Sequence, residues 1–490
     1  MKKILLLVFY ILLLITLEAK PTLYASINSI GYRYEFSTPP DSTKTIRCDI
    51  TYGENTNYEF KALEPSLINI NGKKELRGSI FNLKPNTKYF IRFKIMYGDG
   101  SFDLFYDEIT TLSETIISPT SLIKYVSPTG SGTAYTLASP GNLKTLLAAG
   151  LSCGTTVLLK GGTYSTGDMQ LNLLQDCSSG APIIIMAAPN EKPIIDGGDY
   201  TQYTWTKHTS DTNLYYTTIK PELEYNSLCL FDSLRLYPYA YLTPNSIDPS
   251  YPCLTKLNFD LSGFYRNANL VYIKTLDNKN PNNATIVFSK YFYCLQVQGN
   301  RRKNFVYIKG ITFKNYGKGS CSKDIFGNPT CYPSFTLSFE YANNIIIDSC
   351  NFEFCNLPLS FAHNSNNNII QNCSFIDGVG QWSHGAFKQT RDVSFLERGS
   401  SGRYLEYSSI NQFADDTVQK GFIIRNNYVR GSIGGLVGQR ITGFERIEET
   451  DIYNNKINYC YNGINADGGS INTRIWNNEI DHCSVGLSFI

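Results

Sequence analysis

Basic and aromatic side chains gather in the segment GQWSHGAFKQTR, which spans residues 380–391. It contains His384, Lys388 and Arg391. Burial and neighbouring positive charge lower the pKa of a lysine, which can then act as a base, while a second cation neutralises a carboxylate. That combination suits a lyase, which removes the C5 proton of a uronate sugar. The simpler alternative is a solvated basic rim without a catalytic role.

Three aspartates, Asp415, Asp416 and Asp467, offer a different chemistry. Cleavage of a glycosidic bond generally uses two carboxyl groups, one as an acid and the other as a base or nucleophile. The alternative is that these aspartates only shape turns. A lyase-type Ca²⁺ could bind through Asp416 and Asp467, but the sequence contains no Asp-rich calcium loop and no zinc-like spacing. We therefore predict no metal or cofactor, and a catalytic set of His384, Lys388, Arg391 and Asp467.

The side chains around these candidates could hold a sugar chain. An aromatic ring can stack on a sugar, while amides and a guanidinium can hydrogen-bond to hydroxyl groups. An equally simple interpretation is that Trp382 fills a turn and His384 bonds to a backbone carbonyl. The predicted substrate-binding residues are Trp382, Phe387, Gln389, Gln439, Arg440 and Asn465.

A repeat from Asn343 to Ile490 must position these residues. A separation of twenty-three residues recurs in the pairs Cys350–Cys373, Ile452–Ile475, Asn455–Asn478 and Cys460–Cys483. Short apolar stretches between clusters of Asn, Gly and Ser indicate strands rather than helices. A fixed period of this kind indicates stacked units in which each unit contacts its neighbours.

Aligning the units groups similar residues into columns. We expect an apolar column inside the stack, and an Asn column at a turn where amides pair from one coil to the next. The apolar column contains Phe313, Phe352, Phe375, Val429, Ile457 and Ile480. A glycine column contains Gly385, Gly435, Gly463 and Gly486. The Asn column contains Cys350, Cys373, Asn427, Asn455 and Asn478.

Two segments, DIYNNKINYCYNGINADGG (451–469) and TRIWNNEIDHCSVGLSFI (473–490), resemble the right-handed parallel β-helix family, the pectate-lyase-like group. The resemblance implies that fold for most of the chain. Lyases, hydrolases and adhesins share it, so the activity depends on the site. The NADGG element (465–469) is similar to one element of polygalacturonases, but the order of the elements is reversed here, and we do not carry that mechanism over.

The resemblance also implies which strand lines a substrate groove, namely the one that follows the Asn and Gly turns. Its predicted members are 386–389, 436–439, 464–467 and 487–490. Alternation then directs outward Phe387, Val437, Asn465 and Ser488, together with Gln389, Gln439 and Asp467. The long segment 390–420 would overhang this face.

The start of the chain is typical of a secretory signal, predicted over residues 1–25. Met1-Lys2-Lys3 precede an apolar run from Ile4 to Leu17, shorter than the roughly 20 residues that span a bilayer. We therefore expect a secreted or cell-surface protein with no membrane span after cleavage. A net charge of +2 gives no reason to expect nucleic-acid binding. The predicted partner is an extracellular polysaccharide, and the predicted state is a monomer.

Residues 26–115 alternate β-rich runs with turns, which indicates a small β-sandwich. The pattern Leu83-x-Pro85-x-Thr87-x-Tyr89 resembles fibronectin type III domains, in which this Tyr bonds to the backbone. A linker over 116–123 and a β-helix over 124–490 would follow. A helix over 142–149 would cover the first coil, and a β-rich insertion would occupy about 200–300. Because the repeat stops at Ile490 within a strand, we expect an incomplete C-terminal end.

Thirteen Cys in an exported chain permit disulfides. Cys321–Cys331 is the first candidate pair and Cys153–Cys177 the second. The Cys in the repeat columns are predicted to be small buried hydrophobes, although their spacing does not exclude bridges between coils. The sequence as a whole favours an enzyme acting on an extracellular polysaccharide, as a lyase or a glycoside hydrolase. The alternative is a non-catalytic glycan-binding or adhesion protein.

Overall fold

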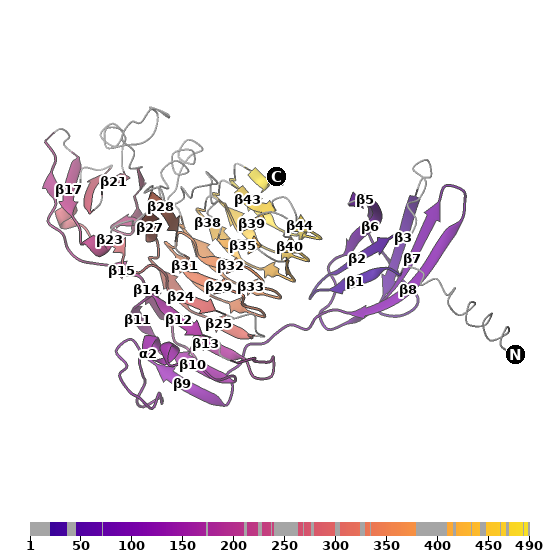
Figure 1. Cartoon of the computed structure of the whole chain (residues 1–490), viewed down its shortest axis with the longest axis horizontal. Helices are drawn as coiled ribbons and strands as arrows, with labels where there is room; N and C mark the ends of the chain where they lie inside the picture. Colours follow the sequence, from indigo (N-terminus) through magenta and orange to yellow (C-terminus); the bar gives the residue numbers. More distant parts are fainter. Residues whose placement is uncertain are drawn as a thin grey trace. The chain divides into compact units, whose positions relative to one another are not determined.

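The computed structural model of this protein divides into two compact units, one ending at Ile116 and the other beginning at Ile117 (Figure 1). The described residues are 20–36, 46–70, 72–172, 175–209, 213–223, 228–236, 238–239, 263–267, 269–275, 279–298, 304–323, 329–333, 335–378, 409–414, 418–432, 434–441, 447–460, 462–466, 470–483 and 485–488.

Two four-stranded antiparallel sheets form the first unit. Side chains of β7 that alternate along the strand, Ile91, Phe93 and Ile95, are buried, and the Phe93 ring meets the Tyr32 ring of the other sheet edge-on at 5.4 Å. One sheet contains β1 (Thr22–Ala25), β2 (Ile30–Glu35), β6 (Lys73–Ile80) and β5 (Ser66–Ile70). The other contains β4 (Phe60–Lys61), β3 (Ile46–Gly53), β7 (Lys88–Tyr97) and β8 (Phe102–Thr110).

Three long parallel sheets form the second unit, and the chain visits them in turn on each coil. The first sheet contains β9 (Leu122–Val126), β10 (Thr155–Leu159), β13 (Ile183–Ala187), β25 (Val306–Lys309), β30 (Ile346–Asp348), β33 (Ile369–Gln371), β37 (Ile423–Arg425), β41 (Asp451–Tyr453) and β45 (Arg474–Trp476). The second sheet contains β11 (Gly162–Ser165), β14 (Pro193–Asp196), β26 (Thr312–Lys314), β31 (Asn351–Glu353), β34 (Ser374–Ile376), β38 (Tyr428–Arg430), β42 (Lys456–Asn458) and β46 (Glu479–Asp481).

The third sheet contains β12 (Met169–Asn172), β24 (Leu295–Gln298), β29 (Leu337–Glu340), β32 (Leu359–Ala362), β35 (Ile410–Ala414), β39 (Val437–Ile441), β43 (Asn462–Ala466) and β47 (Val485–Ser488). A short parallel sheet of β36 (Gln419–Lys420), β40 (Ile447–Glu448) and β44 (Ser470–Ile471) lies between the third sheet and the first along the chain. The predicted fold class, a right-handed parallel β-helix preceded by a small β-sandwich, is confirmed.

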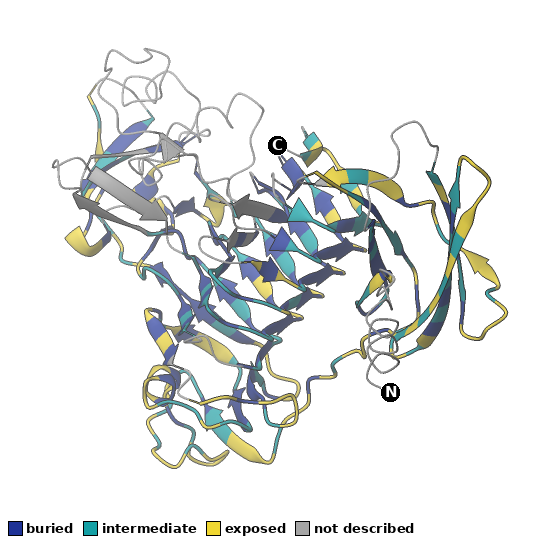
Figure 2. Cartoon of the chain, turned by 45° about the vertical axis from the view of Figure 1, so that its right-hand side comes forward, coloured by how far each residue is buried: buried dark blue, intermediate teal, exposed yellow. Residues whose placement is uncertain are grey.

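Apolar side chains from all three sheets form one core inside the coils. Figure 2 shows that many residues along these strands are buried. In the predicted apolar column, the Phe352 ring stacks on Phe313 and on Phe375, each at a centroid distance of 5.0 Å. Val429, Ile457 and Ile480 continue the column in register. A second aromatic stack, Phe339 on Phe361 at 4.8 Å, is provided by the third sheet.

The predicted Asn column forms a hydrogen-bonded ladder. The Asn455 Oδ1 accepts from the backbone N and the Nδ2 of Asn427, at 2.9 and 3.0 Å. The Asn478 Oδ1 accepts in the same way from Asn455, and the Asn427 Oδ1 accepts from the backbone N of Cys373. A second ladder, which the sequence analysis missed, includes Asn343, whose Oδ1 accepts from the backbone N of Asn366 at 2.8 Å.

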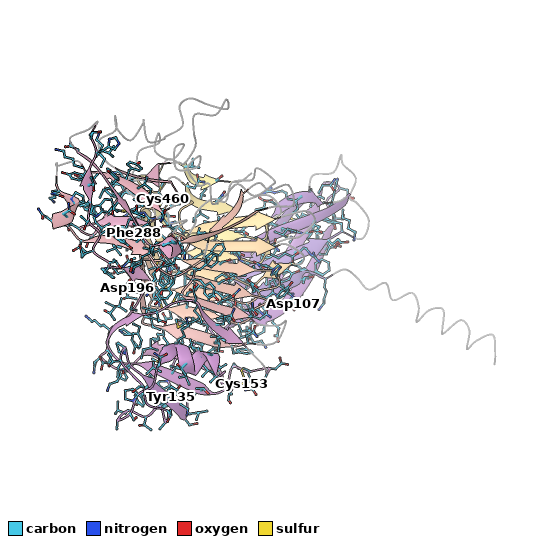
Figure 3. All side chains as sticks on the ribbon, turned by 60° about the vertical axis from the view of Figure 1, so that its left-hand side comes forward. Asp107, Tyr135, Cys153, Asp196, Phe288 and Cys460 are labelled. Atoms are coloured by element: carbon cyan, nitrogen blue, oxygen red, sulfur yellow. A yellow bond between two sulfur atoms is a disulfide. The ribbon has the colours of Figure 1, made fainter. Side chains whose placement is uncertain are left out.

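Helix α2 (Leu143–Ala148) packs against the first coils, as predicted. Asn142 caps it by accepting from the backbone N of Thr145, and its buried leucines join the core of the β-helix. Nearby, the predicted Cys153–Cys177 disulfide is present, with a Cα–Cα distance of 5.4 Å (Figure 3). Cys321 and Cys331 are partners in the backbone register of the hairpin β27 (Gly319–Lys323) and β28 (Pro329–Pro333). The described Cys of the repeat columns are free thiols.

The insertion between β14 and β24 has a hydrophobic core of its own, which includes Trp205, Phe264 and Phe288. Figure 3 labels Phe288. Its first sheet contains β15 (Gly198–Asp199), β23 (Ile286–Ser289), β18 (Cys229–Phe231) and β19 (Leu234–Arg235). Its second contains β16 (Thr206–Lys207), β17 (Leu214–Thr218), β22 (Leu270–Lys274), β21 (Gly263–Asn267) and β20 (Pro238–Tyr239). The short helices η1 (Pro221–Leu223) and η2 (Pro281–Asn283) lie in its connections.

We expect Asn455→Leu or Asn478→Leu to lower the free energy of unfolding by about 1–3 kcal/mol, because the amides above and below lose their partners. Chemical denaturation measures this, with the exposed Asn351→Leu on β31 as the control. If all three variants unfold like the wild type, the ladder does not stabilise the coils.

Tyr89 is buried, and its hydroxyl accepts a hydrogen bond from the backbone N of Lys84 at 3.0 Å. We predict that residues 22–115 fold alone and that Tyr89→Phe lowers their stability by about 1 kcal/mol, because the Lys84 N–H loses its partner. Urea unfolding of the fragment tests this, with Tyr58→Phe as a matched control. An NMR spectrum typical of a disordered chain would contradict the boundary.

Candidate functional site

The outward face of the third sheet is the candidate site. Inward residues of its first rungs, such as Leu171, Val297 and Phe339, are completely buried in the core. Because side chains alternate along a strand, their neighbours Gln170, Gln296 and Glu340 lie on the opposite face. The pattern of apolar residues therefore fixes which polar residues this face presents.

A continuous chain of hydrogen bonds crosses three rungs of this face. Tyr293 lies just before β24, beside the side chain of Gln170. The Gln170 Nε2 donates to the Gln296 Oε1 at 3.3 Å, and the Gln296 Nε2 donates to the Glu340 Oε1 at 3.0 Å. These side chains are exposed or half-buried, so the row Tyr293–Gln170–Gln296–Glu340 offers donors and acceptors along the direction of stacking.

Aromatic rings follow the row where the chain leaves the third sheet. Tyr341 comes directly after Glu340, and its ring stacks on His363 at a centroid distance of 4.5 Å. Both residues have positive φ, at 52° and 57°. The stacking on Tyr341 of the preceding coil explains the position of His363.

The longest connections leave from one corner of the coil, between the second and third sheets. They span 197–294, 315–336 and 377–409, whereas two residues separate the first sheet from the second at β25, β30, β33, β37, β41 and β45. The corner is fastened by Asp168, whose Oδ1 accepts from the backbone N of Phe292 and Tyr293 at 2.9 and 3.2 Å. The insertion is thereby fixed beside the row.

A cation lies at the same corner. Lys318 is half-buried, and burial lowers its pKa from the usual 10.5, an effect that the charges of Asp168 and Glu222 oppose. Burial also raises the pKa of Tyr293, which the hydrogen bond from Gln170 opposes. The corner therefore combines a lysine that loses its proton more readily than usual with a tyrosine that holds its proton more strongly. The sequence pattern indicates neither residue, because both lie in connections without a repeat.

Most of the predicted site residues lie outside the part of the chain that the structure describes. These are the catalytic candidates His384, Lys388, Arg391 and Asp467, with Trp382, Phe387 and Gln389. Gln439 and Arg440 belong to β39, where Gln439 pairs with Ala466 of β43 and Arg440 with Phe413 of β35. Asn465 lies opposite Gly438 and is only 1% exposed. Within the described ranges, no three His, Cys, Asp or Glu residues gather to hold a metal ion.

Two register assignments from the sequence are corrected. Val437, predicted to face outward, is completely buried and pairs with Ile464, so this strand is shifted by one residue. The rung between β32 and β39 is β35, within the segment that was predicted to overhang the face. The reason is that Ile410 supplies the inward apolar side chain there, and Ser409, not a glycine, precedes it and donates its backbone N–H to the Gly435 carbonyl.

The sequence matches no protein-family model and no curated protein. Among solved structures, the chain is similar to XylC in complex with xylose, with 13% identity and a TM-score of 0.43 over 75% of this chain and 65% of that one. It is also similar to a pectate lyase, with 13% identity and a TM-score of 0.26 over 74% of this chain and 80% of that one. A GH87 α-1,3-glucanase from Streptomyces thermodiastaticus has 10% identity and a TM-score of 0.33 over 94% and 67%.

The pectate lyase and the glucanase are parallel β-helix proteins, as this chain is. This chain spans about two thirds of the length of XylC. No helix among the described residues is long and apolar enough to cross a membrane.

The lowered pKa of Lys318 predicts a pH effect on stability. Between its folded pKa and 10.5, the unfolded chain binds the proton and the folded chain does not, so stability rises with pH in that window. Urea unfolding at about pH 8 and about pH 10 should show wild type gaining stability relative to Lys318→Met. A difference between the two proteins that does not change with pH would contradict the assignment.

Proposed function

We propose that this protein is exported and acts on a polysaccharide laid along the outward face of the third sheet. The observation that carries the proposal is the row Tyr293–Gln170–Gln296–Glu340, which repeats polar groups from rung to rung beside the corner with the longest connections. Parallel strands repeat every 4.8 Å or so, which suits a ligand with hydroxyl groups repeating along its length. A rigid scaffold with long loops on one side is a common arrangement for a binding site.

The lyase interpretation gives these residues distinct tasks. A partly buried lysine with a lowered pKa can take a proton at an operating pH closer to neutral than an exposed lysine can. Lys318 would take the C5 proton of a uronate or neutralise its carboxylate, and the row would hold the neighbouring sugars. His384, Lys388, Arg391 and Asp467 remain candidates to complete the site.

One observation favours the alternative, a glycan-binding protein without catalysis. Of the outward positions on β12, β24, β29 and β32, Glu340 is the single carboxylate. Cleavage by hydrolysis generally needs two, separated by about 5–10 Å. Asp467 would have to supply the second group for a hydrolase, whereas binding needs none.

A panel of acidic and neutral polysaccharides tests the proposal. Unsaturated products detected by their ultraviolet absorbance, together with new reducing ends, would identify a lyase. Reducing ends alone would identify a hydrolase, and retention without either product would identify a binding protein. The proposal is wrong if no polysaccharide is bound or cleaved.

We expect Glu340→Gln and Lys318→Met to reduce turnover by about 100-fold or more if their groups transfer protons, and to weaken glycan retention otherwise. Their stabilities should stay within about 0.5 kcal/mol of wild type, because neither side chain belongs to the core. Glu353→Gln is the matched control, since Glu353 lies on the second sheet near Lys314 at 3.9 Å. If both variants keep full activity and retention, the site lies elsewhere, with 379–408 as the next segment to test.

A further inference from the structure

The first unit presents an exposed row of large side chains on its edge strand β8. Phe102, Leu104 and Tyr106 are 55%, 41% and 52% exposed, and they alternate with half-buried residues that face the core. Scattered exposed hydrophobic residues are common, but a contiguous patch commonly marks a binding surface. These exposed side chains of β8 therefore indicate a surface that binds a ligand with an apolar face.

Two cations on strand β7 lie directly beside the exposed side chains of β8. The register pairs Lys94 with Leu104 and Arg92 with Tyr106. The Lys94 Nζ lies 4.9 Å from the centre of the Phe102 ring. Aromatic rings and cations thus alternate across the two strands, and each cation rests against a ring rather than extending into solvent.

The guanidinium of Arg92 is held in place on both sides. Its Nε donates to the Thr51 Oγ1 at 3.0 Å, and its Cζ lies 5.3 Å from the centre of the Tyr58 ring. Tyr58 in turn contacts Tyr106 at a centroid distance of 6.0 Å. A guanidinium held in this way loses little conformational entropy when it meets an anion.

Neither of these cations has a carboxylate partner among the described residues. The neighbouring charges of the same sheet are already paired: Lys61 with Asp49 at 2.7 Å, and Lys88 with Glu108 at 2.6 Å. Arg47 lies 3.9 Å from Glu64. Arg92 and Lys94 therefore leave a local excess of positive charge in the middle of the aromatic row.

We propose that the β7–β8 face of the first unit binds an acidic polysaccharide, with sugar rings packed on Phe102, Leu104 and Tyr106 and carboxylates paired with Arg92 and Lys94. Charge complementarity selects this ligand, because a second copy of the chain would bring the same two cations together. The choice of a polysaccharide among anionic polymers rests on the proposed function, whereas the surface itself does not involve the third sheet.

The test uses the full chain in gels containing polygalacturonate or its fully methyl-esterified form, which has the same rings without the charge. Arg92→Gln with Lys94→Gln should weaken retention by polygalacturonate about fivefold or more and leave retention by the ester unchanged. Phe102→Ser with Tyr106→Ser should weaken both. Two controls lie on the other sheet. The charge control is Lys73→Gln with Lys74→Gln, and the apolar control is Leu67→Ser.

The same measurements in the Glu340→Gln background separate this surface from the outward face of the third sheet. Retention that survives Glu340→Gln and is lost with the β7–β8 variants supports the proposal even if no turnover is found. Unchanged retention in the β7–β8 variants overturns it. Equal loss of retention on both gels for the Arg92→Gln/Lys94→Gln variant also overturns it. So does a variant that loses binding to phosphatidylserine vesicles but not to the gels. A change from dimer to monomer in size-exclusion chromatography would likewise overturn it, because the face would then be an interface between copies. Thermal melting equal to wild type excludes misfolding as the cause.

Discussion

Hydrogen bonding between successive coils is the constraint on which the second unit depends. Each strand of the three sheets obtains its backbone partners from the coils before and after it, so no coil is complete alone. The side chains also find their partners in the neighbouring coils. Asn427, Asn455 and Asn478 satisfy one another and the backbone of the preceding coil. The apolar column is buried from Phe313 to Ile457 because each of its members stacks on the next.

This constraint decides where the chain can vary. At the corner between the first and second sheets, a residue with positive φ turns the chain within two residues, as Asn372, Asn426, Asn454 and Asn477 do. Asn tolerates that conformation better than most residues. The turn is short and the Asn ladder fills it from Cys373 onwards, so the corner keeps two residues from β25 to β45, whereas five residues join β13 to β14. In the described part of the chain, the corner between the second and third sheets has no such ladder. This corner contains the β-rich insertion and the β27–β28 hairpin. The candidate functional groups consequently lie beside the third sheet.

The sequence predicts well what the period determines and poorly what interrupts it. The columns of Phe352, Asn455 and Cys373 follow from a spacing of twenty-three residues, and the helix at 143–148 follows from its leucines and Asn142. The rung at Ile410 was missed because Gly385 resembled the glycine of other coils, although Ser409 fills that position. Lys318 and Tyr293 could not be found by pattern, because burial and an insertion that returns to Asp168 bring them to the face.

The two proposed surfaces differ in a way that suits different tasks. The third-sheet face offers amides and a carboxylate fixed on a rigid stack, which favours precise orientation of individual sugars. The β7–β8 face offers exposed rings and two cations, whose interactions are individually weak and are reduced by salt. Weak contacts of this kind release a polymer quickly. A polymer that reached both faces would make the second contact intramolecular, and the chain would then gain residence time without a tight grip that slows release from the third-sheet face.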